Sequence, residues 1–315
     1  MTTPTPTPAP AKPPRDLRIV ALRRFAAAIT ILTLFGQTLL GFEPGWIHVV
    51  ASLATGYLLE AVLELVDARL AGRPPGWSGG GLGRFVDFFL PSHITALAVA
   101  MLLYAGERVF PVMFGTAVAI GTKALFRVPT GPGKTRHFLN PSNTGIAAGL
   151  LFLPAMGSSP PYQFTEGVMG AWDWVIPGVI IVTGTVLNAK LTRKIPLILG
   201  WLGGFVLQAA IRTLFFGGSF EALLVPMTGV AFVLFTNYMV SDPATTPTEP
   251  RRQVAFGLAV ALVYGLLRAI FHLYFTIFYA LFLVCLTRGV YLWVTARVAA
   301  PSPAAPRLQT APIRT

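Results

Sequence analysis

The residues with the clearest chemical potential lie together at the start of an apolar stretch, in the run Arg-His-Phe-Leu-Asn-Pro-Ser-Asn that begins at residue 136. Asn140 is a favourable cap for a helix start, and Pro141 suits the first helical position, where no needed backbone donor is lost. The positive end of the helix dipole at this start suits a phosphate or a polarised carbonyl group. The side chains predicted to hold such a cofactor or ligand are those of Arg136, Asn140, Ser142 and Asn143. An ordinary capped entrance of a membrane-spanning helix, flanked by positive charge, explains the same pattern.

A second polar segment closes another apolar stretch, from Thr236 to Thr248. Asp242 precedes Pro243, and a residue before proline tends to end a helix. Serine, threonine and aspartate side chains can then bond the backbone groups that the helix leaves free. This segment is either a plain helix exit or one wall of a vestibule, in which Asn237 and Asp242 face the helix start at Asn140.

Other sites of chemistry are largely excluded. Cys285 is the single cysteine, so the chain alone forms no disulfide and no all-cysteine metal site. Zinc-type histidine spacing, a Ser-His-Asp arrangement and a Walker loop are also lacking, and no metal site is predicted. Glu60 and Glu64 share one helical face and are expected to point into the bundle or a cavity, or, for Glu64, toward the membrane interface. For His93, a hydrogen bond between helices is the favoured role.

The composition predicts a membrane protein, because 54% of the residues are hydrophobic and only 11% are charged. The formal charge of +12 could suggest nucleic acid as a partner. The basic residues, however, stand singly or in small groups at the ends of apolar runs, where they are expected to set topology. The predicted partner is therefore the lipid bilayer and not a nucleic acid.

The elements that must position the polar residues are apolar runs of about 20 residues, the length that crosses a bilayer. Ten such runs are predicted, near 21–41, 46–66, 87–105, 109–126, 139–156, 174–190, 195–215, 221–241, 253–268 and 270–293. With this division, every Lys and Arg except Arg108, Arg212 and Arg268 falls on one side. The expected protein is thus a multi-pass protein of the cell membrane with both termini cytoplasmic. Residues 19–296 would form the ten-helix domain, between disordered cytoplasmic tails at 1–18 and 297–315.

Two short similarities suggest that the domain is a duplication. Residues 114–120 resemble residues 256–262, and the Leu-Pro pair at position 90 resembles the Val-Pro pair at position 225. Chance matches between helices rich in small residues are common, so chance is the alternative. If the repeat is real, its halves, about 19–157 and 172–296, contain five spans each and enter the membrane from opposite sides. The fold class predicted is an all-α polytopic membrane protein with two inverted five-helix repeats.

Several of these segments resemble the NqrB/RnfD family, the integral membrane subunits of sodium-pumping quinone reductase and of the Rnf electron-transport complex. The similarity runs from about the third span to the tenth, and its most specific part is the segment from Met227 to Thr248, with Asp-Pro-Ala-Thr-Thr-Pro-Thr at its end. A closer similarity, to the UnbU-type members encoded with enediyne biosynthesis in actinomycetes, is carried by residues 136–145, 160–166 and 187–205. The resemblance implies ten spans in two inverted halves, with other membrane or redox subunits or biosynthetic enzymes as partners.

The chain departs from the family in one place that concerns the cofactor. The electron-transferring members carry FMN on a threonine of a Ser-Gly-Ala-Thr type motif, in the loop after the Asn-Pro span. The matching loop here contains only Thr165, and no Gly-Ala-Thr occurs in the chain. The resemblance therefore leaves FMN or another flavin as a non-covalent cofactor and argues against covalent attachment at Thr165.

Three functions follow as hypotheses. The resemblance favours a redox-associated membrane component of enediyne biosynthesis, a subunit of an oxidoreductase or electron-transport system with no catalysis alone. Inverted repeats with a site near the midplane also occur in transporters, so export of a small molecule or ion is the first alternative. A membrane scaffold that recruits biosynthetic enzymes through its basic loops is the second.

Overall fold

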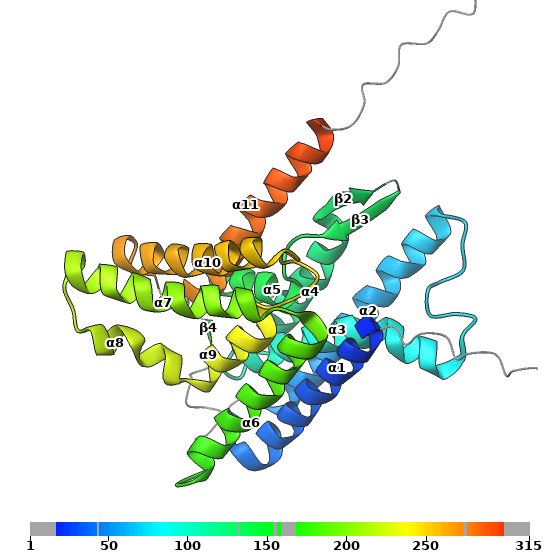
Figure 1. The fold of residues 1–315 in the computed structure, drawn as a ribbon. Coiled ribbons are helices and arrows are strands. Elements are labelled where there is room, and N and C mark those ends of the chain that lie inside the picture. The colour runs from blue at the N-terminus through cyan, green and yellow to red at the C-terminus, as the bar shows by residue number, and fades with distance from the viewer. Residues whose placement is uncertain are drawn as a thin grey trace, which may run out of the picture.

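A computed structural model describes residues 17–42, 44–131, 133–153, 156–158, 168–273 and 276–298. The chain is a bundle of helices that cross at steep angles (Figure 1). In the first half these are α1 (Leu17–Phe35), which continues as the π-helical η1 (Gly36–Leu40), α2 (Trp46–Leu70), α3 (Gly81–Leu102), α4 (Phe110–Leu125) and α5 (Pro141–Phe152). The predicted tails fall mainly on residues 1–16 and 299–315, which lie outside the described residues.

The second half begins with α6 (Trp172–Leu187), which continues as the π-helical η3 (Asn188–Thr192), and α7 (Ile195–Phe216). A broken segment follows, made of α8 (Phe220–Leu224), the 3-10 turn η4 (Val225–Thr228), α9 (Val230–Leu234) and the π-helical η5 (Phe235–Met239). The last helices are α10 (Pro250–Ile270) and α11 (Thr276–Val298). Three short π-helices within the described part of the chain are unusual, and such turns often occur at functional sites.

The protein is a helical, multi-pass membrane protein. Within the described residues, seven helices are long and apolar enough to cross a bilayer, and an eighth span results if the two helices that meet at 71° near Gly229 count as one. Every predicted apolar run contains helix, but α4 has 16 residues and α5 has 12. At 1.5 Å per residue α5 is about 18 Å long, shorter than the hydrocarbon layer of about 30 Å. The ten-span plan therefore remains a prediction.

Two short strand pairs add to the helical architecture that the sequence predicts. Strands β2 (Arg127–Gly131) and β3 (Lys134–His137) form an antiparallel hairpin between α4 and α5. At the other end of these helices, β1 (Leu103–Tyr104) pairs with β4 (Gly157–Ser158). The sequence signal for the hairpin is the Gly-Pro-Gly run that begins at residue 131. Apolar periodicity alone does not show it. The second strand of the hairpin, β3, leads directly to the start of α5.

Small residues allow the closest helix contacts. Helices α7 and α10 approach so closely that a Cβ added at Gly204 would lie 2.7 Å from the Ala261 Cβ, and one added at Gly257 would lie 2.5 Å from the Trp201 backbone nitrogen. Trp201 is fully buried in this interface. Association through small residues is the usual way for helices to pack in a bilayer.

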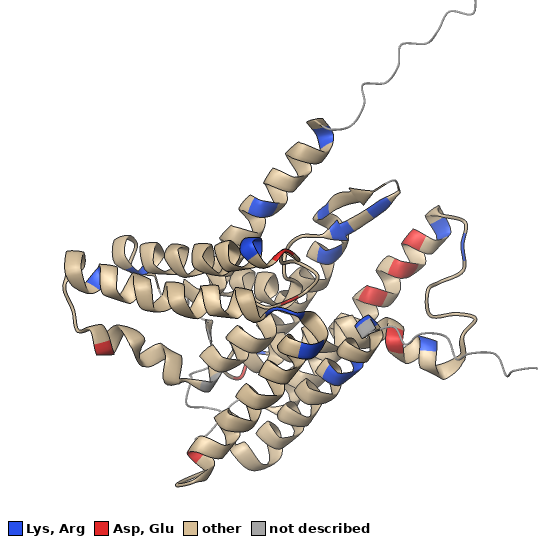
Figure 2. Cartoon of the chain, in the orientation of Figure 1, with Lys and Arg blue, Asp and Glu red and all other residues tan. Residues whose placement is uncertain are grey.

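Most charged residues lie near helix ends (Figure 2). Ion pairs join several of these helices. Arg23 of α1 pairs with Asp87 of α3 at 2.7 Å, and Lys123 of α4 pairs with Glu60 of α2 at 2.7 Å. Glu64 pairs with Arg73 at 2.6 Å, just beyond the end of α2. Glu60 and Glu64 are thus partners of basic residues near the helix ends.

Candidate functional site

The two polar segments that the sequence singles out meet in space, in a region that we call the polar junction: residues 136–143 and 235–247, together with Asn188, Lys194 and the facing residues of α11. Asn140 caps α5, because its Oδ1 accepts a hydrogen bond from the Asn143 backbone N–H at 3.0 Å. Its Nδ2 donates to the Met239 carbonyl oxygen at 3.1 Å. Asn140 is buried, so both halves of its amide group are used inside the protein.

Proline explains why the Met239 carbonyl is available. In a continuous helix this oxygen would accept from the backbone N–H four residues later, but that residue is Pro243, which has none. The oxygen accepts instead from the Asp242 N–H, at 3.3 Å, and from Asn140. The asparagine that starts α5 therefore completes the end of η5.

A second pair of asparagines joins the two π-helical segments. Asn188 of η3 donates through Nδ2 to the Asn237 carbonyl oxygen, at 2.7 Å, and to the Gly184 carbonyl oxygen, at 2.9 Å. Asn237 of η5 donates through its own Nδ2 to the Val233 carbonyl oxygen, at 3.1 Å. Both asparagines are buried. Their side-chain amides donate to backbone carbonyl oxygens in and just before the two π-helical segments.

Asn143 is the one member of the α5 start with a free buried atom. Its Nδ2 donates to the Phe278 carbonyl oxygen of α11 at 3.0 Å. Its Oδ1 is buried and has no hydrogen-bond partner. Buried acceptors without a partner are rare and costly, so this oxygen marks a place for a donor from water or a ligand.

Asp242 organises the loop that follows η5. Its two carboxylate oxygens accept from the Ala244 N–H at 3.0 Å and from the Thr245 hydroxyl at 2.8 Å. Two basic side chains from other parts of the chain donate to backbone oxygens of the same loop. Lys194 donates to the Pro247 carbonyl oxygen at 2.6 Å, and Arg288 donates to the Thr245 carbonyl oxygen at 2.9 Å. Both carboxylate oxygens of Asp242 therefore accept hydrogen bonds within the loop and hold its shape.

The junction carries excess positive charge. Burial lowers the pKa of Lys194 to about 8. The nearby charge of Asp242 raises this pKa, whereas the charges of Arg136 and Arg288 lower it further. Burial also lowers the pKa of His137 to about 4, again opposed by Asp242. Among the described residues, the salt bridges include none of Arg136, Lys194 and Arg288. Three cations with one shared acid make an electrostatic environment that favours an anion.

The structure brings six of the predicted site residues into this junction and leaves one outside the described residues. Arg136, Asn140, Ser142, Asn143, Asn237 and Asp242 belong to it. Thr165 lies outside the described residues. Sequence reasoning assigned Lys194 and Arg288 only to topology. The one signal for Lys194 was its place just before the start of α7, where a cation opposes the helix dipole.

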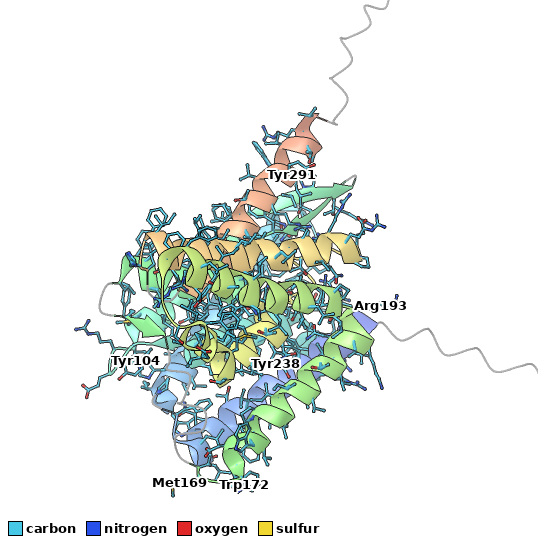
Figure 3. All side chains as sticks on the ribbon, turned by 60° about the vertical axis from the view of Figure 1, so that its left-hand side comes forward. Tyr104, Met169, Trp172, Arg193, Tyr238 and Tyr291 are labelled. Atoms are coloured by element: carbon cyan, nitrogen blue, oxygen red, sulfur yellow. The ribbon has the colours of Figure 1, made fainter. Side chains whose placement is uncertain are left out.

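A large apolar cavity adjoins the junction. Its volume is about 740 Å³, and it lies between α1, α3, α6 and η5, with Ser142 of α5 in its wall. In Figure 3, Trp172 and Arg193 mark the two ends of the α6–η3 segment, and Tyr238 lies between them. The Tyr238 hydroxyl contacts the Thr183 hydroxyl of α6 at 3.2 Å inside the cavity lining.

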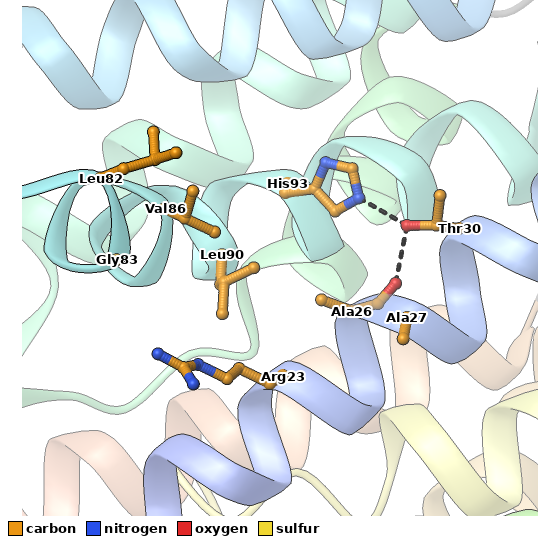
Figure 4. A pocket seen from close by; sticks show the side chains of 9 residues that line it. All are labelled: Arg23, Ala26, Ala27, Thr30, Leu82, Gly83, Val86, Leu90 and His93. Atoms are coloured by element: carbon orange, nitrogen blue, oxygen red, sulfur yellow. Dashed lines mark hydrogen bonds between the residues drawn. The ribbon is translucent and has the colours of Figure 1, made fainter.

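A second cavity, of about 520 Å³, lies between the amino-terminal parts of α1 and α3 (Figure 4). His93 stands at its end, 2.7 Å from the Thr30 hydroxyl and 2.6 Å from the Tyr57 hydroxyl. Thr30 gives its only proton to the Ala26 carbonyl oxygen, so the Nε2–H of His93 donates to Thr30 and Nδ1 accepts from Tyr57. His93 therefore links three helices, as the sequence analysis favours.

Comparison of the chain with models of known protein families and with curated proteins gives no match. The resemblance to the NqrB/RnfD family therefore rests on the residues quoted for it.

Proposed function

We propose that this protein is a membrane component of a redox system related to the NqrB/RnfD subunits, serving an oxidation or reduction step in enediyne biosynthesis. Its polar junction holds the anionic end of a cofactor, FMN or another flavin, without a covalent bond. The observation that carries the proposal is the group of cations around the capped start of α5, where Arg136, Lys194 and Arg288 outnumber the single carboxylate of Asp242.

The donor set suits the phosphate of such a cofactor. Arginine binds phosphate through two parallel hydrogen bonds, and the start of α5 adds the positive end of a helix dipole. The unpaired Oδ1 of Asn143 could accept a hydrogen bond from the same ligand. A bound flavin would supply the electron transfer. The residues of the chain would neutralise its charge and fix its position.

The ten-span inverted plan belongs to the same proposal, and corresponding helix pairs support it. In the first half α2 packs on α4, where the Thr116 hydroxyl donates to the Ser52 hydroxyl at 2.6 Å. In the second half α7 packs on α10, five spans later in the proposed order, through Gly204 and Gly257. The broken η4–α9 segment then lies where an inverted repeat places discontinuous helices.

Spectroscopy of the purified protein tests the cofactor. We expect flavin absorbance and fluorescence that leave with the small-molecule fraction after denaturation, and no fluorescent protein band on a denaturing gel. Arg136→Gln should lower the flavin content severalfold, whereas Lys190→Gln, at an exposed position outside the cation group, should not. A colourless preparation from cells that make flavins would overturn the redox proposal.

Cysteine labelling in intact cells tests the topology. Cys285 is buried, so the native background is low. Lys134→Cys and Lys190→Cys lie on the proposed cytoplasmic side, and Arg108→Cys lies on the opposite side; all three positions are exposed. We expect an impermeant reagent to label only the last. Labelling of Lys134→Cys would mean that α4 and α5 turn back inside the membrane and that the ten-span plan is wrong.

A transporter is the second candidate, favoured by the 71° break between Phe220–Thr228 and Ala231–Met239. Discontinuous helices bind substrates or ions in many secondary transporters. Movement of a substrate by flavin-free protein in proteoliposomes would favour this function over the redox one.

A further inference from the structure

The cavity of about 740 Å³ is a ligand-sized space that the proposed function does not use. Its volume falls within the range of pockets that hold drug-sized molecules, about 300 to 1,000 Å³. It is built from both halves of the chain, since α1 and α3 form one wall and α6 and η5 form the other. A site between the halves cannot be predicted from one helix alone.

The lining excludes a charged occupant. Among the described residues, every side chain that lines the cavity is uncharged. Arg23 and Asp87 pair with each other near the amino-terminal ends of α1 and α3 and are not part of the lining. Moving an unpaired charge into such an apolar space is strongly unfavourable, so the occupant must be neutral.

Three hydroxyl groups make one part of the cavity polar: those of Ser142, Thr183 and Tyr238. The Thr183 hydroxyl gives its proton to the Val179 carbonyl oxygen at 2.7 Å, so Tyr238 is the donor in their contact of 3.2 Å. The Tyr238 oxygen then keeps acceptor capacity, and its proton can turn from this long bond to a better acceptor. The ring is held by an edge contact with Phe25 at 5.1 Å between centroids.

The cavity opens toward lipid. Its rim includes Ile31 of α1, 54% exposed, and Val179 of α6, 56% exposed. Trp172, at the end of α6, is also in the lining and 59% exposed. Exposed apolar residues on two neighbouring helices of a membrane protein face the hydrocarbon layer, so a ligand would enter sideways from the bilayer.

We propose that this cavity binds a neutral, elongated lipophile with one terminal hydroxyl group, whose oxygen bonds Tyr238 while its apolar body lies between α1, α3 and α6. Because Ser142 and Met239 belong both to this lining and to the polar junction, the hydroxyl end lies beside the start of α5. The proposal does not depend on an anion being bound in the polar junction.

Binding of retinol and 1-hexadecanol to the full-length protein in nanodiscs tests the proposal. We expect saturable binding of both alcohols, with retinol quenching the tryptophan fluorescence of the protein, and weaker binding of palmitate at a pH where it is ionised. Tyr238→Phe should weaken binding of the alcohols about three- to tenfold, as for one lost hydrogen bond. The matched control is Tyr291→Phe, whose ring lies on α11, 65% exposed and outside the cavity (Figure 3).

A cavity-filling variant gives an independent test. Ala28→Trp places a large ring inside the lining and should abolish binding, whereas Leu199→Trp on the exposed face of α7 should not. Equal binding by hexadecane or by ionised palmitate, an unchanged affinity in Tyr238→Phe, or no binding of either alcohol would overturn the proposal. Flavin content is measured on the same preparations, so failure of the redox proposal and failure of this site are distinguished.

Discussion

The side-chain amide of Asn140 donates a hydrogen bond to the backbone carbonyl oxygen of Met239, 3.1 Å away and 99 positions later in the chain. One residue starts a helix of the first half, and the other ends a π-helical segment of the second. The bond therefore joins the two segments at a buried point, where Pro243 removes the helical donor to the Met239 oxygen. Loss of this bond should destabilise both the start of α5 and the end of η5.

Substitution at Asn140 separates its two roles. Asn140→Ser keeps an oxygen that can cap α5 but loses the donor to Met239, and we expect a loss of about 1–3 kcal/mol in the free energy of unfolding. Asn140→Ala also loses the cap and should cost about 1 kcal/mol more. Equilibrium unfolding in mixed detergent micelles measures both. Ser142→Ala should change the stability by less than about 0.5 kcal/mol, and an equal loss there would show that the junction is not held by Asn140.

Lys194 should make the protein more stable in mild alkali. Its pKa in the folded state is about 8, below its usual value of 10.5, so folding disfavours the charged form. The penalty is complete below pH 8 and disappears as the pH rises to 10.5, a gain of about 3 kcal/mol. Unfolding curves across this window should show the gain in the wild type and not in Lys194→Met. Lys190→Met, at an exposed position, should keep it; a flat wild-type profile would contradict the buried-lysine assignment.

His137 should destabilise the protein in mild acid. Its folded pKa is about 4, below its usual value of 6.5, because the ring is partly buried and lies near the cations of the hairpin. The unfolded chain takes up a proton first, so stability falls as the pH drops from 6.5 to 4, by about 3 kcal/mol at most. His137→Gln should remove this part of the acid sensitivity. His272→Gln, at an exposed position between α10 and α11, serves as the control.

The contact between α7 and α10 should tolerate a methyl group at one glycine and not at its neighbour. A Cβ at Gly204 would lie 2.7 Å from the Ala261 Cβ, whereas one at Gly203 meets nothing within 4 Å. We expect Gly204→Ala to cost about 1–3 kcal/mol through overpacking. Gly203→Ala should be neutral or slightly stabilising, because alanine is the better helix former. Equal stability of the two variants would mean that the helices pack less closely than the structure shows.

Properties encoded within a few neighbouring residues could be predicted from the sequence. The hydrophobic composition and the apolar runs indicated a membrane protein, and each run contains a helix. The pair Asn140-Pro141 marked a helix start, and the cap is present. Helix length was less predictable for α5: apolar residues continue past its end at Phe152, so hydropathy alone could not show that this helix has only 12 residues.

Contacts between distant residues were decided only by the tertiary structure. The sequence indicated two polar segments, but their meeting through Asn140 and Met239 depends on how the helices cross. The same holds for Lys194, whose burial comes from the loop that ends near Pro247. The cavity likewise exists only where faces of helices from both halves come together. Hydropathy and capping are local properties of the chain. The way the helices cross is set by close packing at small residues such as Gly204 and Gly257, and no local sequence pattern shows which residues pack against them.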